Sequence, residues 1–462
     1  MHDFAVSGSG VSGGRVAYEL AGGGASCVML EAGRAYDRTS FPPDELGYTT
    51  QMYWNSGLEV TKDGTIGMMR GKCLGGTSVL NQADFSRFDT YALDDDWRPR
   101  TGIEFLTVEG LTPAYEYLDD DVASGEIAAE HRNPSARMFT GALEQLGYHW
   151  QPINRGQTDC RLDAGSDCIV CLGGCPRDAK QSALVAQLPQ ARAKGLEVET
   201  EWEVLTIEDR GDHGVVVRGS QRGRTAEVRA RQVVLAAGAF GNVAILQRSE
   251  LAEELPALGT GFACHPQIMT FGLHEEPVDA HKGALQSVES HDTKLREEGL
   301  KLENVFGPPI AMAMLLDGWG VDHLQKMKRY RHLACFEVAI RDENTGTVEV
   351  GRNGQMKVDK ALTDVDRAKI ARALELSAQL HDAAGASEVE LCDTTFGLHL
   401  MGGCAIGTDP ARSVVGPDFR VHGHPNLWSA DSSVFPSAPG QNPSYTIMAL
   451  SYLAAGEMLN GG

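Results

Sequence analysis

Three glycines near the N-terminus constrain the fold more than any other feature of the chain. Residues 4–6 predict a short buried strand, and Gly8, Gly10 and Gly13 follow it, before a helical segment at residues 16–20. A turn of this kind needs glycines because a pyrophosphate must reach backbone N–H groups at the start of a helix, where a Cβ would hold it away. The order of strand, glycine turn and helix predicts a site for a dinucleotide.

A second strand supports this interpretation. Residues 27–30 are apolar and lead into Glu31, which lies 23 positions after Gly8. A carboxylate at the end of that strand can accept hydrogen bonds from both hydroxyls of an adenosine ribose and would repel a 2′-phosphate. The segment therefore predicts an α/β, doubly wound domain of the Rossmann type rather than an isolated glycine-rich turn.

A second glycine-rich segment favours a flavin over a nicotinamide cofactor. Residues 70–81 contain Gly71, Gly75 and Gly76 together with small polar residues, which suits a loop that lies against a flat ring or a second phosphate contact. A fold that binds only NAD does not require such a loop, whereas the extended FAD molecule needs contacts far from its adenine end.

These blocks resemble the glucose-methanol-choline (GMC) family of flavoprotein oxidoreductases. Three further blocks agree in order: residues 233–239, residues 399–407, and a C-terminal block at residues 426–446. The resemblance implies an FAD-binding domain interwoven with an α+β substrate domain that contains an antiparallel sheet. The implied FAD-binding residues are Gly8, Ser9, Gly10, Ser12, Gly13, Glu31, Ala32, Gly71, Gly75, Gly76, Thr77, Ser78, Asn81, Val204, Ala237, Gly238, Asp431, Asn442, Pro443 and Thr446.

Within the family, the chain is most similar to the bacterial long-chain alcohol and sterol oxidase or dehydrogenase branch. The similarity rests on residues 171–182, 341–348 and 383–386, and it implies an apolar or bulky alcohol as substrate. The methionine-rich segment 305–316 could line a pocket for such an alcohol, or it could be core. The family's active-site block is altered here at Gly403, Ala405 and Ile406, which replace Thr, Arg and Met.

His399 and Asn442 are the candidate catalytic residues. Oxidation of an alcohol requires a group that takes the hydroxyl proton while a hydride leaves for flavin N5, and an imidazole has an ordinary pKa of about 6.5. We therefore predict His399 as the proton acceptor. Asn442 matches the family's second active-site residue, and its amide can donate a hydrogen bond to the substrate oxygen. His265 is predicted to be structural, and His422 and His424 are predicted to lie in a surface turn.

A cluster of cysteines leaves two interpretations open. Cys160, Cys168, Cys171 and Cys175 end in a C-x3-C-P pattern that is typical of iron–sulfur ligation, with Cys168, Cys171 and Cys175 as the candidate ligands. An iron–sulfur cluster would carry electrons away from the flavin, and zinc is a further option. The alternative is that these cysteines bind nothing.

The GMC resemblance implies that the chain crosses between its domains. We predict residues 1–90, 155–262 and 393–462 as the FAD-binding domain, and residues 91–154 and 263–392 as the substrate domain. Apolar spacing predicts helices over residues 134–146 and 364–384, and turn signals predict strands within residues 332–359 that form one wall of the substrate cavity.

Composition excludes several partners. The net charge of −22 makes a nucleic acid an improbable ligand, because phosphates would be repelled. The sequence shows no secretion signal and no integral membrane segment, so we predict a cytoplasmic protein. Its predicted partners are a small-molecule alcohol and an electron acceptor, either O2 or a redox protein, with a small subunit or homo-oligomer as further options.

The predicted function is FAD-dependent oxidation of an alcohol CH–OH group to the carbonyl. Two alternatives stay open at this point. One is the catalytic subunit of an electron-transferring sugar or polyol dehydrogenase with an iron–sulfur cluster. The other is a non-redox offshoot of the family, of the lyase or photodecarboxylase type.

Overall fold

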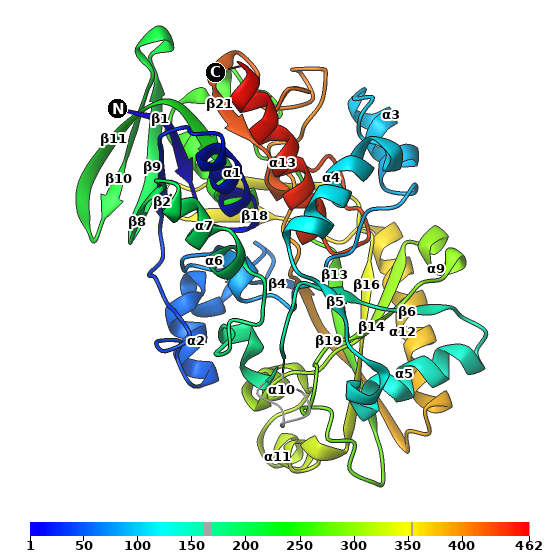
Figure 1. The fold of residues 1–462 in the computed structure, drawn as a ribbon. Coiled ribbons are helices and arrows are strands. Elements are labelled where there is room, and N and C mark those ends of the chain that lie inside the picture. Colours follow the sequence, from blue (N-terminus) through cyan, green and yellow to red (C-terminus); the bar gives the residue numbers. More distant parts are fainter. Residues whose placement is uncertain (161–167, 353, 462) are drawn as a thin grey trace.

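Two eight-stranded sheets, each with its own helices, dominate the computed structural model (Figure 1). The structure describes residues 1–160, 168–352 and 354–461. The two sheets differ in character, because the first has a parallel centre of buried strands and the second is almost entirely antiparallel. This mixed α/β architecture is the fold class that the sequence predicts.

The first sheet is built around the N-terminal strand β1 (His2–Ser7), which lies parallel to both of its neighbours. Its order is β20-β21-β11-β1-β2-β8, and β10 and β9 extend it beyond β11 as antiparallel strands. Helix α1 (Val11–Gly22) follows β1 and packs against the C-terminal helix α13 (Ser444–Gly461). The other strands are β2 (Cys27–Glu31), β8 (Glu197–Thr200), β9 (Trp202–Asp209), β10 (Val215–Gln221), β11 (Arg224–Leu235), β20 (Arg420–Val421) and β21 (His424–Ser429).

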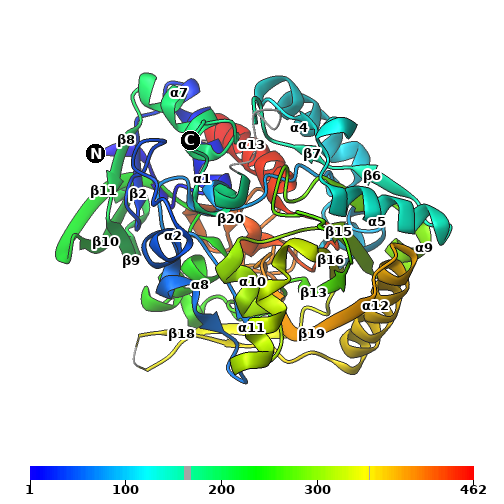
Figure 2. The ribbon, with the colours of Figure 1, turned by 90° about the horizontal axis from the view of Figure 1, so that it is seen from below.

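The second sheet has the order β3-β4-β19-β13-β16-β15-β14-β6. Its apolar face is covered by α5 (Pro134–Gln145) and α12 (Asp364–Ala383), which close a separate hydrophobic core (Figures 1 and 2). The strands are β3 (Glu59–Val60), β4 (Ile66–Met68), β6 (Trp150–Pro152), β13 (Pro266–Leu273), β14 (Val288–Ser290), β15 (Leu300–Asn304), β16 (Leu333–Ile340) and β19 (Glu388–Gly397).

The remaining elements connect or border these two layers. Strand β12 pairs with β17, and β17 with β18, in a three-stranded sheet, while β5 pairs with β7. Their bounds are β5 (Gly125–Glu126), β7 (Asn154–Arg155), β12 (Thr260–Phe262), β17 (Gly346–Val350), β18 (Met356–Asp359), α2 (Glu45–Met52), α3 (Arg98–Thr101), α4 (Val108–Asp121), α6 (Ala183–Ala186), α7 (Leu188–Ala193), α8 (Gly238–Arg248), α9 (Thr293–Glu298), α10 (Pro309–Leu315) and α11 (Gly320–Lys328).

The structure confirms the two helices predicted at residues 134–146 and 364–384, which are α5 and α12. The strands predicted within residues 332–359 also form, but they do not share one sheet. Only β16 joins the large sheet, because β17 and β18 make a hairpin that pairs with β12 instead. The prediction that this whole region forms one wall of the cavity was therefore wrong for β17 and β18.

The chain passes repeatedly between the two large sheets. It leaves the first sheet after β2, adds β3, β4 and β6 to the second, and returns for β8 to β11. It then adds β13 to β16 and β19 to the second sheet, and ends with β20 and β21 in the first. Strands β3 and β4 fall within residues 1–90, yet they pair with the second sheet rather than the first. The discontinuous domain boundaries stay a prediction.

Candidate functional site

The glycine turn between β1 and α1 leaves room for a phosphate. Gly8 has a φ of +100°, and a Cβ on Gly13 would lie 2.0 Å from the Gly8 carbonyl oxygen, so both positions require glycine. A Cβ on Gly10 would meet no protein atom within 4 Å, and no side chain caps α1 at this residue. The open space therefore lies at the start of α1, where the helix dipole favours an anion.

Glu31 ties the turn to the end of β2. Its carboxylate accepts hydrogen bonds from the backbone N–H of Ser9 (3.1 Å), the Ser9 hydroxyl (2.6 Å) and the backbone N–H of Gly33 (2.7 Å). The Ser9 hydroxyl also accepts a bond from the Gly75 N–H (2.8 Å), so it connects the first glycine turn to the second. Two predicted FAD-binding segments thus meet at one carboxylate.

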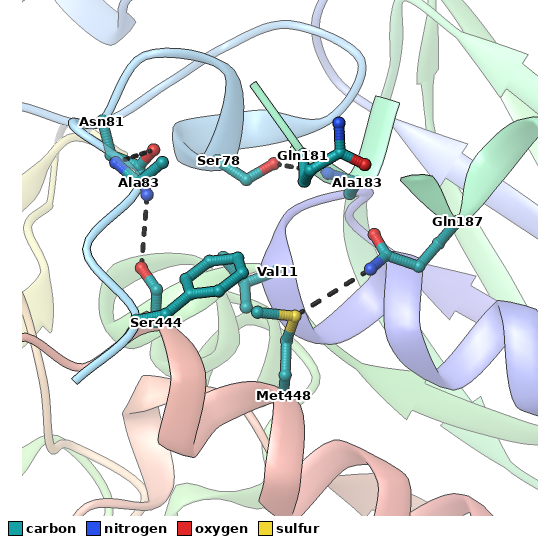
Figure 3. Close-up of a pocket in the computed structure, with 10 residues that line it drawn as sticks. Val11, Ser78, Asn81, Ala83, Gln181, Ala183, Gln187, Ser444 and Met448 are labelled. Atoms are coloured by element: carbon teal, nitrogen blue, oxygen red, sulfur yellow. Dashed lines mark hydrogen bonds between the residues drawn. The ribbon is translucent and has the colours of Figure 1, made fainter. Parts of the chain in front are cut away.

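A pocket opens between the second glycine loop, α1 and α13 (Figure 3). Ser78 and Asn81 line it from the loop, and Ser444 and Met448 line it from α13. The Asn81 amide donates to the Ser444 hydroxyl (3.2 Å), and Gly71 donates its N–H to the Thr77 hydroxyl (3.0 Å). These contacts hold the loop against the start of α13, which Pro443 precedes.

Three of the remaining predicted FAD-binding residues, Ala237, Gly238 and Asp431, follow the carboxyl ends of β11 and β21, and the others lie elsewhere in the fold. The Asp431 carboxylate accepts bonds from the Gly238 N–H (2.7 Å) and the Asn242 amide (3.0 Å), and Asn242 in turn accepts from the Ala237 N–H (2.9 Å). Ala32 follows β2, Val204 lies buried in β9, Ser12 bonds to Ser451 of α13 (2.8 Å), and Thr446 bonds to Tyr115 (2.6 Å). These residues fit an extended dinucleotide. They would hold the FAD phosphates at the turn and the ribose at Glu31.

The predicted catalytic residues line a second pocket. His399 follows β19 and Asn442 precedes α13, and both border one pocket. The same pocket is lined by Gly440, Gln441, Ala339 and Ile340. Two segments that are 43 positions apart in the chain therefore converge on one cavity.

Two further residues of this pocket were not predicted to act there. Nδ1 of His265 lies 3.1 Å from Nδ1 of His399, although the sequence analysis treated His265 as structural. Nζ of Lys301 lies 2.7 Å from the amide oxygen of Asn442. The sequence around Lys301 did contain a pattern that could have drawn attention to it, because charged residues alternate with leucines in β15. No sequence pattern links His265 to His399, because only the fold brings the two together.

Burial keeps both histidines neutral. Desolvation lowers the pKa of His265 well below its usual value, and the neighbouring His399 adds to the effect. Desolvation, together with the positive charge of Lys301, lowers the pKa of His399 to about 4. At neutral pH the pocket therefore contains two uncharged imidazoles.

A row of polar side chains covers the face of the second sheet opposite α5 and α12. Gln151, Glu289, Glu303 and Glu337 stand opposite one another on neighbouring strands, and Lys301 shares their face. Nζ of Lys301 lies 2.5 Å from Glu289 and 2.7 Å from Glu303. Desolvation raises the pKa of Glu303 to about 7 and that of Glu337 to about 8.

The cysteine cluster is described only in part. The side chain of Cys168 lies outside the residues that the structure describes. The Cys160 thiol donates to Gln157 (3.2 Å), and Cys171 is buried. Within the described ranges, Cys160, Cys171 and Cys175 do not bring three sulfur atoms within 4.8 Å of one another. These three residues alone are therefore no ligand set, and the iron–sulfur prediction stays a prediction.

Two other expectations change. His424 lies at the start of β21 and is only 9% exposed, so it is not the surface turn residue that the sequence suggested, whereas His422 hydrogen bonds to Ser413 (2.9 Å). For the segment 305–316, the sequence left pocket lining and core packing both open. It forms α10 and its flanks, its buried members such as Met312 pack in the core of the second sheet, and none of its residues lines the pocket of His399 and Asn442.

The glycine turn at the start of α1 and the pocket that His399 and Asn442 line are features that a flavoprotein oxidoreductase requires. Comparison with known families agrees, since the N-terminal model described as GMC oxidoreductase matches residues 49–267 and the C-terminal model matches residues 343–451. The chain belongs to the GMC oxidoreductase family. It is an FAD-dependent oxidoreductase that acts on CH–OH donors, which confirms the family and the cofactor predicted from the sequence.

Individual relatives cover nearly the whole chain. An uncharacterised GMC-type oxidoreductase of Mycobacterium tuberculosis is 30% identical over 98% of this chain and 75% of its own length. The long-chain-alcohol oxidase FAO4B of Arabidopsis thaliana is 24% identical over 99% of this chain and 67% of its own length. Among solved structures, pyridoxine 4-oxidase from Mesorbium loti superposes with a TM-score of 0.78 at 18% identity, covering 98% of both chains, which shows the shared fold. None of the described helices is long and apolar enough to cross a membrane.

Proposed function

We propose that the protein oxidises an alcohol CH–OH group to the carbonyl, with loss of the hydroxyl proton and transfer of a hydride to flavin N5. One observation carries the proposal: His399 and Asn442, the residues predicted to contact the hydroxyl, line the same pocket. Bound FAD would supply the hydride acceptor. The electron acceptor that follows would be O2 or a redox protein, and we propose a cytoplasmic location.

The chain's own residues bind and orient the hydroxyl in this proposal. His399 is a titratable side chain of the pocket wall, beside His265 and Lys301, and we propose it as the group that exchanges the hydroxyl proton. The amide of Asn442 would donate to the oxygen as negative charge develops there.

The proposed substrate is an apolar or bulky alcohol. Relatives named long-chain-alcohol oxidases, from Arabidopsis thaliana, support it. A polar polyol or amino sugar is a second candidate. It is favoured by the polar side chains of Gln441 and Lys301 in the pocket lining, and a 26% identical relative is named 6'''-hydroxyparomomycin C oxidase, from Streptomyces lividus.

An anaerobic absorption experiment tests the proposal. The purified holoenzyme is mixed under nitrogen with long-chain, sterol and sugar alcohols, and iron is determined on the same sample. Bleaching of the flavin by one class establishes alcohol oxidation and names that class. Flavin that no alcohol bleaches would instead favour the lyase or photodecarboxylase alternative, and stoichiometric iron would favour the electron-transferring dehydrogenase.

A variant tests the role of the pocket. His399→Ala should retain the yellow flavin, because within the described residues His399 makes no hydrogen bond to a predicted FAD-binding residue. The flavin of this variant should no longer be reduced by alcohol. Undiminished reduction would remove His399 from the reaction.

A further inference from the structure

Lys301 fixes the direction of the Asn442 amide. An ammonium group has only donors, so the amide oxygen of Asn442 must be the atom that faces Nζ at 2.7 Å. The amide NH2 therefore points away from Lys301. Among the described residues it has no hydrogen-bond partner, and it belongs to a side chain that lines the pocket.

Buried carboxylates hold Lys301 in this position and keep it charged. Its Nζ lies 2.5 Å from Glu289, 2.7 Å from Glu303 and 3.4 Å from Asp84, and its side chain is 8% exposed. These carboxylates raise the pKa of Lys301 well above its usual value, against the effect of desolvation. The ammonium therefore remains a donor throughout the accessible pH range, and Asn442 keeps its orientation.

A second chain of hydrogen bonds fixes the proton of His399. The Gly440 backbone N–H donates to Nε2 of His265 (2.8 Å), so this nitrogen carries a lone pair. Neutral His265 must then carry its proton on Nδ1, which lies 3.1 Å from Nδ1 of His399. Nδ1 of His399 is therefore the acceptor, and neutral His399 carries its proton on Nε2.

The backbone supports this arrangement. His265 has a φ of +46°, an uncommon conformation for a histidine, and its N–H donates to the Asp342 carboxylate (3.1 Å). Asp342 is paired with Lys360 at 2.8 Å, and both side chains are fully buried. The buried pair holds the strained residue so that its ring lies between Gly440 and His399.

We infer that His399 and Asn442 both present N–H donors to the substrate oxygen, with His265 and Lys301 as the positioning residues that set these two directions. The pocket of the resting enzyme is therefore a two-donor site for an electron-rich oxygen, such as an alkoxide or a carbonyl. His399 can take a proton on Nε2 only after its tautomer has changed. This inference rests on the proposed function in one respect only, which is that the oxygen bound by the two donors belongs to the alcohol substrate.

Nitrogen NMR tests the histidine half without any turnover. In holoenzyme labelled with ring-15N histidine, the His399 signals are assigned by their loss in His399→Gln. We expect a protonated Nε2 and an unprotonated Nδ1 at pH 7. A protonated Nδ1 would overturn the inference, whether or not any alcohol bleaches the flavin, so its failure is distinct from failure of the proposed function.

A variant at residue 265 should reverse the tautomer. His265→Asp places a carboxylate, which can only accept, opposite Nδ1 of His399, and aspartate tolerates a positive φ better than most residues. The His399 proton should then move to Nδ1. His265→Asn is the matched control of similar shape without the charge, and its amide can donate as well as accept, so the His399 proton should stay on Nε2 or be shared between the two ring nitrogens. A proton that stays on Nε2 in His265→Asp would show that residue 265 does not set the tautomer. If the aspartate variant does not fold, the measurement on the wild type at pH 7 still decides the assignment.

Two substitutions test the asparagine half. Asn442→Asp keeps the shape but replaces the NH2 group with an oxygen, and Asn442→Leu removes both polar atoms without adding charge. Because Asn442 is also a predicted FAD-binding residue, the rate is measured per bound flavin. If the wild type presents a donor, both variants should lose about 10²- to 10³-fold in the rate of flavin reduction by an alcohol that bleaches the wild type. Retention of the rate within about threefold in Asn442→Asp would overturn the inference, because it would show that an acceptor suffices there.

Discussion

Removal of the buried lysine behind His265 should destabilise the protein far more than removal of an exposed lysine with the same partner. Lys360 and Asp342 are 2.8 Å apart, and neither side chain is exposed. Lys62 and Asp359 are 2.7 Å apart, but their side chains are 68% and 57% exposed. The two pairs therefore match in residue types and distance and differ in burial.

Lys360→Met should cost about 3 to 5 kcal/mol of unfolding free energy, because it leaves the Asp342 carboxylate charged in a dry site. Lys62→Met should cost almost nothing, since water solvates both partners of that pair. Urea titrations of both holoenzymes, followed by tryptophan fluorescence, measure the difference. An equal loss in the two variants would refute the reasoning.

The pH dependence gives the sign of the effect. Burial raises the pKa of Asp342 above its usual value, and loss of Lys360 raises that pKa further. Below the unfolded pKa of about 3.9, a carboxyl whose folded pKa is raised is protonated in both states and does not change the free energy of unfolding. Above that pH it lowers the free energy of unfolding by about 1.4 kcal/mol per pH unit, until the folded pKa is reached. Lys360→Met should therefore be closest to the wild type near pH 4 and furthest from it at pH 8.

Three further predictions concern the cofactor and the pocket. Gly13→Ala should destabilise the fold, because its methyl group would lie 2.0 Å from a backbone oxygen. Gly10→Ala should fold, because its methyl group meets no protein atom within 4 Å, but it should lose FAD, because the methyl group would occupy the space predicted for the phosphates. Thermal melts and flavin content separate the two variants. Glu31→Ala should be purified without FAD, and a yellow Glu31→Ala protein would contradict the ribose assignment. The rate of flavin reduction should fall in acid only as pH approaches about 4, where His399 is protonated, so a loss centred near pH 6.5 would show that its pKa is not lowered.

The sequence predicted the glycine turn and its surroundings better than it predicted the pocket of His399 and Asn442. The glycine turn and Glu31 are local signals, since each position is set by the backbone or by the atoms beside it, and the structure places them as the pattern requires. His399 and Asn442 were found because the residues around them resemble blocks of the GMC family, and the fold brings them to one pocket. The role of His265 could not be predicted, because its contact with His399 spans 134 positions.

Strand β15 of the second sheet shows why periodicity alone cannot predict which face of a strand is exposed to water. Strand β15 alternates Leu300, Leu302 and the charged Lys301 and Glu303, which is the pattern of a strand with one solvated face. Here the polar face is buried instead, because the second half of the fold covers it. A sequence pattern reports polarity, and only the tertiary structure shows whether water or protein lies opposite.

The loop that carries Gly440 is held by two arginines from the substrate side of the molecule. Arg296 donates to the Gly440 carbonyl (2.7 Å) and pairs with Asp89 (2.8 Å), and Arg341 donates to the Ala438 carbonyl (3.0 Å). Because the same loop presents the Gly440 N–H to Nε2 of His265 (2.8 Å), these arginines help to fix the hydrogen bond from which the tautomer of the pocket imidazole is inferred.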